Sequence, residues 1–157
     1  MKLPELGPRG EGWVAVQLVL IGATVGCGFV GIYWPHSVEG FLVVFGLVVI
    51  VAGAAVFVLG VLSLGSSLTP FPRPRTGAVF REGGPFKHVR HPIYGGVILL
   101  MLGWSIAEAP LGLVPTATLA VFFDLKARRE EAWLGERYPE YAGYLARTPR
   151  RFVPWFY

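Results

Sequence analysis

The sequence predicts an all-α, polytopic membrane protein with four transmembrane helices, the last of which extends into the cytosol. Hydrophobic residues make up 54% of the 157 positions and charged residues only 15%, a composition too apolar for an ordinary soluble domain. The apolar residues gather in four stretches, and all 14 Lys and Arg residues lie outside them. A chain of this length has room for one membrane-embedded unit, so we expect a single domain over residues 1–157.

The N-terminal part, residues 1–68, contains the first two expected spans. They run from about Gly12 to Trp34 and from about Val38 to Leu68. Each is as long as or longer than the roughly 20 residues that a helix needs to cross a bilayer core. These two spans are therefore expected to have a structural role, and the functional residues are expected in the rest of the chain.

Small residues are regularly spaced on both spans. Gly22 and Gly26 form a GxxxG pattern on the first span, and Gly46, Gly53 and Gly60 recur every seven residues on the second. Glycines allow two helices to approach closely. We expect both surfaces to pack within the monomer, with a dimer interface as the alternative, so the oligomeric state stays open.

Residues 69–157 are expected to form a cofactor-binding loop, a helical hairpin and a C-terminal cytosolic segment. The loop opens with Thr69–Thr76, whose three prolines exclude a helix and favour an extended path along the membrane surface. Pro92 suits the first turn of a helix because its missing N–H would have no partner there. The apolar run from Pro92 to Ala107 reaches only about 24 Å at 1.5 Å per residue, which predicts a short or partly recessed third helix.

The fourth apolar stretch follows a turn at Glu108–Pro110. It runs from Leu111 to Phe123 and continues without a helix-breaking residue through Asp124–Arg137. Because this continuation is rich in charged residues, we expect it to leave the membrane and project into water.

The positive charges indicate the orientation of the chain. Lys2 and Arg9 precede the first span, five cations lie between the second and third spans, and seven lie from Lys126 to Arg151. The two remaining turns carry none, so the positive-inside rule places both termini, the central loop and the active face in the cytoplasm. Membrane orientation accounts for the net charge of +4 without nucleic acid, and the expected partners are membrane lipids and a lipophilic or lipid substrate.

The start of the third helix is the first candidate site. His91 would occupy the cap position and Arg90 would lie just outside it. Helix N-termini attract anions, and Gly95 and Gly96 would leave the first turn bare enough for a flat ligand to lie against it. In the alternative interpretation Arg90 binds lipid phosphate and His91 only caps the helix. Nothing in the residue spacing indicates a bound metal.

Two adjacent carboxylates, Glu130 and Glu131, form the second candidate site. Helical periodicity places Glu131 with Ala127 and Leu134 on one face, and Glu130 with Lys126 on another. We expect Glu131 to face inward and Glu130 to form a solvated ion pair. A charge turned inward at a membrane boundary costs about 2.5 to 3.5 kcal/mol at mid-helix, which favours a functional role for Glu131. A structural pairing of Glu131 with Arg90 is the alternative.

Taken together, the motifs of the second half of the chain form a specific pattern. They are Gly84–Phe86, Arg90–Gly95, Glu130 and Glu131 with Leu134, Tyr138–Tyr141 with Tyr144, and Pro149, Arg150, Phe152 and Pro154. This pattern resembles the isoprenylcysteine carboxyl methyltransferase family and its phospholipid methyltransferase relatives over roughly Arg81–Trp155. Tyr138 and Pro139 depart from it, because many relatives have Phe and Gly there.

The resemblance implies an integral membrane methyltransferase with S-adenosylmethionine as methyl donor, bound on the cytosolic side. The implied cofactor contacts are His91, Pro92, Tyr94, Gly95, Glu130, Glu131, Tyr138 and Tyr141. The expected catalytic residues are Glu131, Arg137 and Arg150, and the expected contacts of the substrate head group are Arg90, Arg150 and Arg151. Because the cofactor is water-soluble and the acceptor lipophilic, the site should open both to the cytosol and to the bilayer.

The methyl acceptor stays open at this point. An isoprenylcysteine-like carboxylate needs no general base, whereas a phospholipid amine must lose a proton, for which Glu131 or His91 would have to assist. Two alternatives of other classes are an NADPH-dependent membrane reductase, whose Arg-His-Pro-x-Tyr-like turn is similar, and a non-catalytic membrane interaction protein. The known membrane reductases with this turn are much longer than this chain.

Overall fold

A computed structural model describes residues 3–74 and 76–153, which form helices and no strand. Four residues that belong to the sequence patterns above lie outside the described residues: Lys2, Arg75, Pro154 and Trp155. The helices are α1 (Glu11–Gly26), α2 (His36–Leu64), α3 (Pro92–Ala107), α4 (Leu113–Arg137) and α5 (Tyr141–Arg147), with short 3-10 turns at Cys27–Phe29, Gly65–Ser67, Gly84–Lys87 and Pro110–Gly112. The predicted all-α class is confirmed.

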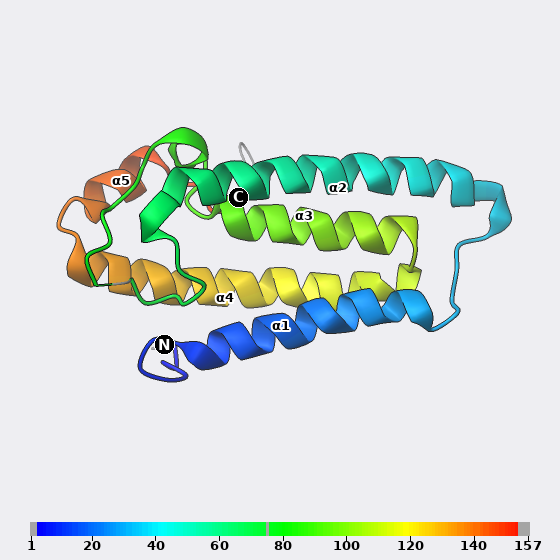
Figure 1. Ribbon diagram of the computed structural model, residues 1–157, viewed down its shortest axis with the longest axis horizontal. Coiled ribbons are helices and arrows are strands. Elements are labelled where there is room, and N and C mark those ends of the chain that lie inside the picture. The colour runs from blue at the N-terminus through cyan, green and yellow to red at the C-terminus, as the bar shows by residue number, and fades with distance from the viewer. Residues whose placement is uncertain (1–2, 75, 154–157) are drawn as a thin grey trace.

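The four long helices form an elongated bundle in which α2 packs along α3 and α1 along α4 (Figure 1). The N-terminal segment, α5 and the loop between α2 and α3 gather at one end, the left end in Figure 1. Contacts tie these segments together: Arg73 Nη1 donates to the carbonyl of Pro8 at 2.9 Å, and Arg129 pairs with Glu5. We call this the polar end of the bundle.

The α2–α3 contact depends on glycines from both helices. A Cβ atom on Gly53 would lie 2.8 Å from the backbone nitrogen of Leu100, and one on Gly46 would lie 2.6 Å from the carbonyl oxygen of Gly103. Gly60 meets Ile93 in the same way at 2.8 Å. The prediction that the glycines of the second span pack within the monomer is confirmed.

The two glycines of the GxxxG pattern on α1 make no comparable helix contact among the described residues. A Cβ atom on Gly22 or Gly26 would meet nothing within 4 Å in the described part of the chain. The helix packs through another face, on which Trp13 and Thr24 are buried, and the Trp13 ring lies 5.4 Å from that of Phe122 in α4. The expectation of monomer packing for Gly22 and Gly26 was therefore wrong.

This difference gives a matched pair of stability tests. Replacing Gly53 with leucine forces side-chain atoms into the backbone of α3, so we expect a loss of about 1–3 kcal/mol or more in the free energy of unfolding. Replacing Gly22 with leucine should leave stability unchanged, because its Cβ enters open space. Thermal unfolding in detergent measures both, and equal effects would contradict the described helix packing.

Most of the helix boundaries agree with the sequence, with one difference at the end of the first span. The third helix starts at Pro92 and ends at Ala107 as predicted. The first span, expected to continue to Trp34, ends in a 3-10 turn at Phe29, and Gly31 then adopts a left-handed φ of 79° that stops the helix. Trp34 instead donates from its indole N–H to the carbonyl of Ile106 at 2.7 Å, closing the turn against α3.

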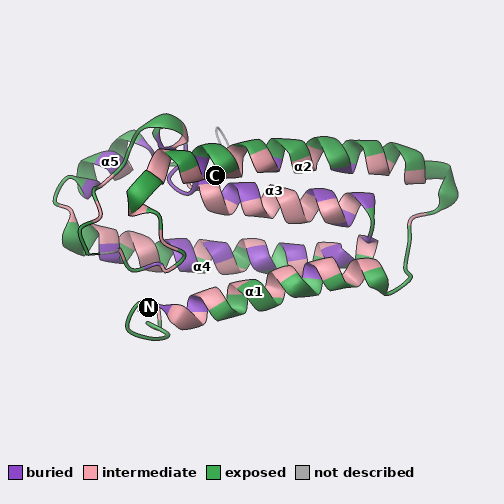
Figure 2. Ribbon diagram, in the orientation of Figure 1, coloured by how far each residue is buried: buried purple, intermediate pink, exposed green. Residues whose placement is uncertain are grey.

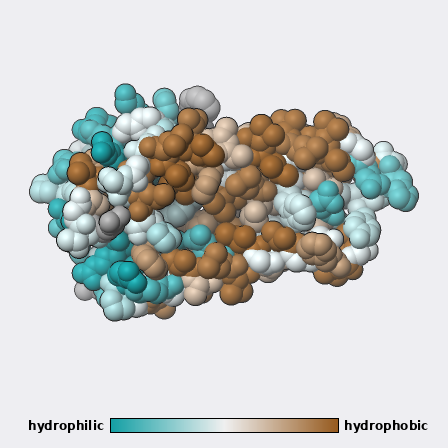
Figure 3. All heavy atoms as spheres, viewed as in Figure 1, coloured by the Kyte–Doolittle hydropathy of each residue, from teal (hydrophilic) through white to brown (hydrophobic). Residues whose placement is uncertain are grey.

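Three helical segments are long and apolar enough to cross a membrane: Glu11–Phe29, His36–Ser67 and Pro110–Arg137. At 16 residues α3 is shorter than these spans. The outer face of α2 is largely exposed, and hydrophobic side chains cover the middle of the molecule while hydrophilic ones gather mainly at the polar end (Figures 2 and 3). The length and composition of the three segments are those of an integral membrane protein.

Candidate functional site

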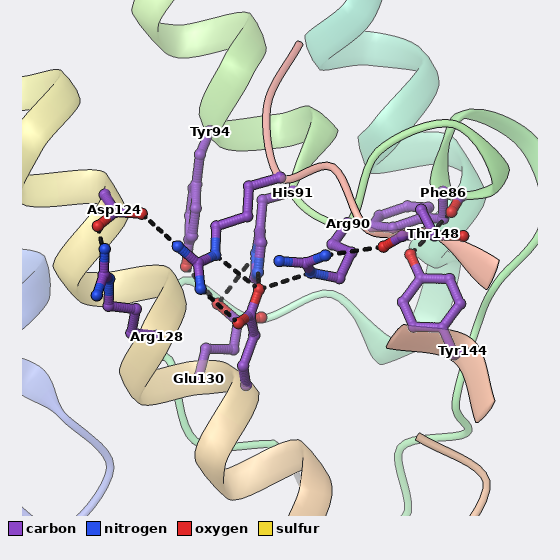
Figure 4. A network of polar contacts seen from close by, with 11 residues as sticks. Phe86, Arg90, His91, Tyr94, Asp124, Arg128, Glu130, Tyr144 and Thr148 are labelled. Carbon is purple, nitrogen blue, oxygen red and sulfur yellow. Dashed lines mark hydrogen bonds and ion pairs between the residues drawn. The ribbon is translucent and has the colours of Figure 1, made fainter. Parts of the chain in front are cut away.

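A charged cluster centred on Glu131 joins α3, α4 and the C-terminal segment at the polar end (Figure 4). Arg90 Nε donates to Glu131 Oε1 at 2.8 Å, and His91 Nε2 lies 3.1 Å from the same oxygen. Arg151 donates to both carboxylate oxygens at 3.2 Å. Only 12% of the Glu131 side chain is exposed, so the prediction that Glu131 faces inward is confirmed. These four residues are called the Glu131 cluster below.

Backbone pairing brings the C-terminal segment into this cluster. The N–H groups of Arg90 and His91 donate to the carbonyls of Arg150 and Arg151 at 2.9 and 2.8 Å. Arg151 also donates to Asp124 Oδ1 at 2.7 Å. Burial alone would lower the pKa of the Arg151 guanidinium, but its bonds to Glu131 and Asp124 outweigh that effect and raise the pKa. Arg151 therefore holds its charge between two carboxylates.

Two of the arginines predicted to act at the site lie elsewhere. Arg150 is exposed and lines a surface depression with His88 and Phe152. Arg137 is exposed as well, with its guanidinium 5.6 Å from the ring centre of Tyr138. Neither forms part of the Glu131 cluster.

The first turn of α3 is not bare, contrary to the prediction from its glycines. A Cβ atom on Gly95 would lie 2.9 Å from the carbonyl oxygen of Phe152, and one on Gly96 would lie 2.7 Å from the backbone nitrogen of Phe57. The C-terminal segment and α2 thus occupy the space expected for a ligand. Pro92 is buried and lines the depression beside Arg150.

Glu130 also faces the protein, so the predicted solvated ion pair was wrong. The Tyr94 hydroxyl donates to Glu130 Oε2 at 2.6 Å, and 26% of the Glu130 side chain is exposed. The face of α4 that bears Glu130 and Lys126 is covered by α1 and the segment after α2, since Lys126 bonds Gln17 and Pro70. Helical periodicity separates the faces of a helix but does not show which neighbours cover them.

The first of two adjoining cavities is lined by aromatic side chains. Phe80 is one of these residues, and its ring centre lies 5.5, 5.7 and 5.3 Å from those of Tyr138, Tyr141 and Tyr144. Burial raises the pKa of both Tyr141 and Tyr144, so their hydroxyls stay protonated. Arg90, His91 and Glu130 complete the wall. We call this the aromatic cavity; its volume is about 100 Å³.

The second cavity lies among the four long helices of the bundle. Its lining includes Phe57 and Val61 of α2, Ile93, Tyr94 and Val97 of α3, Gln17 of α1, and Lys126 of α4. Its volume is about 290 Å³, and most of its surface is apolar. Arg90, His91 and Glu130 line this apolar cavity as well as the aromatic one. The two cavities therefore share one charged wall.

Sequence reasoning did not predict that Phe80, Lys126 or Gln17 lines a cavity. A signal for Gln17 was present, because a polar residue inside an otherwise apolar span marks a functional site by default. Lys126 was counted as a charge that orients the chain and as a neighbour of Glu130 on one helix face, but not as a residue that lines a cavity. Phe80 carried no signal, since its position depends on the path of the loop between α2 and α3.

The two cavities, one lined by aromatic and polar side chains and one mostly apolar, meet at the charged wall. The family model described as phospholipid methyltransferase matches residues 41–141, more than half of the chain, and the chain therefore belongs to the phospholipid methyltransferase family. This match confirms the family resemblance seen in the sequence.

The chain is also similar to a protein whose name refers to metal resistance. The chain is 37% identical over 73 residues to the cobalt-zinc-cadmium resistance protein CzcN of Cupriavidus metallidurans. The match covers 44% of this chain and 33% of that protein, so the chain spans about a third of the length of this relative.

Proposed function

We propose that this protein transfers a methyl group from S-adenosylmethionine to a lipophilic acceptor, with an isoprenylcysteine-like carboxylate as the leading candidate. The observation that carries the proposal is the pair of cavities, one aromatic and one apolar, that share Arg90, His91 and Glu130. A methyltransferase with a soluble donor and a lipophilic acceptor needs such an arrangement, because its two substrates arrive from different solvents.

The residues of the aromatic cavity fit the donor. Aromatic faces such as Phe80 and Tyr141 attract a sulfonium, a guanidinium such as Arg90 pairs with a carboxylate, and Glu130 suits an amino group or ribose hydroxyls. At about 100 Å³ the cavity is smaller than the roughly 300 Å³ at which ligand pockets begin. Donor binding therefore requires the covering segments 69–74 and 78–81 to move outward.

The apolar cavity fits the acceptor, whose hydrocarbon part would lie among the residues of α1, α2, α3 and α4 that line this cavity. In this proposal α3 is a fourth, short span that starts at the polar end, and the positive-inside rule places this end in the cytoplasm. The donor would then enter from the cytosol and the acceptor from the bilayer.

The chemistry at the shared wall is mainly positioning. The donor supplies a methyl group on a sulfonium, and transfer is an in-line displacement that needs aligned reactants and little water. A carboxylate acceptor needs no proton removed. Glu131, held by two arginines, would position Arg90 and His91, while Glu130 would contact the ligand.

A phospholipid amine is the second candidate acceptor, favoured by the description of the matching family. An amine must lose a proton before it attacks. Glu130 is the carboxylate placed to accept it, because Glu130 lines both cavities, whereas the oxygens of Glu131 are bonded to Arg90 and Arg151.

Calorimetric titration of the detergent-purified protein tests the proposal. We expect S-adenosylmethionine and S-adenosylhomocysteine to bind and NADPH not to bind. Lipid extracts incubated with isotopically labelled donor and analysed by mass spectrometry should then show a labelled lipophilic product. Binding of NADPH alone would support the reductase alternative and overturn the proposal.

A further inference from the structure

A buried cation in the apolar cavity has no role in the function proposed so far. Only 1% of Lys126 is exposed. Its ammonium donates to the side-chain oxygen of Gln17 and, at 3.2 Å, to the carbonyl of Pro70. It also lies 5.0 Å from the ring centre of Tyr94 and 5.9 Å from that of Phe123. These contacts hold the amine in place with neutral and aromatic partners.

No carboxylate among the described residues forms an ion pair with Lys126. Glu130, one helical turn further on, lines the same cavity and attracts the Lys126 ammonium electrostatically, but it is not in ion-pair contact with Lys126 and accepts a hydrogen bond from Tyr94. A buried charge is costly unless it is paired, and neutral oxygens offset only part of that cost. The cavity wall therefore carries an ammonium that a negatively charged group in the cavity would compensate.

Gln17 adds a second donor at the same place. Its side-chain oxygen accepts from Lys126, which leaves its amide N–H groups for another acceptor. Both side chains line the apolar cavity, and both come from helices that fix their positions. An oxygen anion attached to a hydrocarbon chain matches this combination of an apolar cavity, an ammonium and an amide.

We propose that Lys126 and Gln17 bind the anionic group of the lipophilic acceptor, a carboxylate or a phosphate, inside the apolar cavity. This inference rests on the proposed function, because it assigns the apolar cavity to the acceptor. It makes Lys126 a specificity-determining residue: the ammonium attracts an acidic lipid and repels a lipid whose only charge is positive. Lys126 does not line the aromatic cavity, so donor binding does not depend on it.

Direct binding measurements without the donor test this proposal. The probes are N-acetyl-S-farnesylcysteine, its neutral methyl ester, and lysophosphatidylethanolamine, each titrated into detergent-purified protein. We expect the native protein to bind the acid about tenfold or more tightly than the ester, as a charge-assisted hydrogen bond provides. Lys126→Met should abolish that preference and Lys126→Arg should retain it. If the bound anion is instead a phosphate, Lys126→Met should lower the affinity for lysophosphatidylethanolamine.

Gln17→Glu separates an anion-binding role from a structural one. The new carboxylate would form an ion pair with Lys126, so the fold should be kept or strengthened while the acid loses its preference over the ester. The inference would be overturned if the native protein bound the acid and the ester equally and Lys126→Met did not change the affinity for lysophosphatidylethanolamine. S-adenosylmethionine binding, titrated separately, reports on the proposed function, so the two failures are distinguishable.

Discussion

Replacing Glu131 with glutamine is expected to remove both the stability of the polar end and the binding of the methyl donor. Glu131 is the shared partner of Arg90 and Arg151, and loss of its charge leaves the mostly buried Arg90 guanidinium without a carboxylate among the described residues. Removing one partner of a buried ion pair costs on the order of 3–5 kcal/mol. Thermal unfolding in detergent should therefore show a large decrease in midpoint.

The matched control is Glu136→Gln, since Glu136 is exposed on the same helix. This substitution should change neither the unfolding midpoint nor the dissociation constant of S-adenosylmethionine. If Glu131→Gln were as stable as Glu136→Gln, the Glu131 cluster would not hold the C-terminal segment against α3 and α4.

Replacing Glu130 with glutamine should weaken binding of the methyl donor without the loss of stability expected for Glu131→Gln. Glutamine can still accept the hydrogen bond from Tyr94, so the unfolding midpoint should stay close to that of the native protein. The cavity wall loses its negative charge, however, and we expect affinity for S-adenosylmethionine to fall about tenfold or more, as for other charge-assisted bonds. Calorimetric titration measures the change.

Tyr94→Phe is the control for Glu130→Gln. It removes the hydrogen bond to Glu130 but leaves the carboxylate in the cavity wall. Donor affinity should therefore decrease less in Tyr94→Phe than in Glu130→Gln. If Glu130→Gln bound S-adenosylmethionine with unchanged affinity, the role of Glu130 would be limited to its hydrogen bond with Tyr94.

Local sequence signals predicted the helices well because their causes are local. Pro92 begins α3 since a proline fits only the first turn, and α3 ends at Ala107, where the apolar run stops. The glycines of α2 predicted a close helix contact, and Gly46 and Gly53 make it with α3. The end of the first span was not predicted correctly, because Gly31 adopts a left-handed backbone conformation and the helix ends before Trp34.

The site was predicted less completely because distant segments build it. Helical periodicity gave the inward direction of Glu131 but could not show that α1 covers the other face, on which Lys126 contacts Gln17. The sequence also left open which tail arginine belongs to the site. Backbone pairing of residues 90–91 with residues 150–151 brings both arginines near the cluster, and only the side chain of Arg151 bonds to Glu131.

The central claim is that a methyl donor binds in the aromatic cavity and reaches an acceptor across the wall formed by Arg90, His91 and Glu130. An experimental structure of the protein with S-adenosylhomocysteine tests it most directly. The account predicts the nucleoside among Phe80 and the nearby tyrosines, with the sulfur beside Glu130 and facing the apolar cavity. Binding of the compound in the depression beside Arg150, or with the sulfur turned away from the apolar cavity, would contradict it.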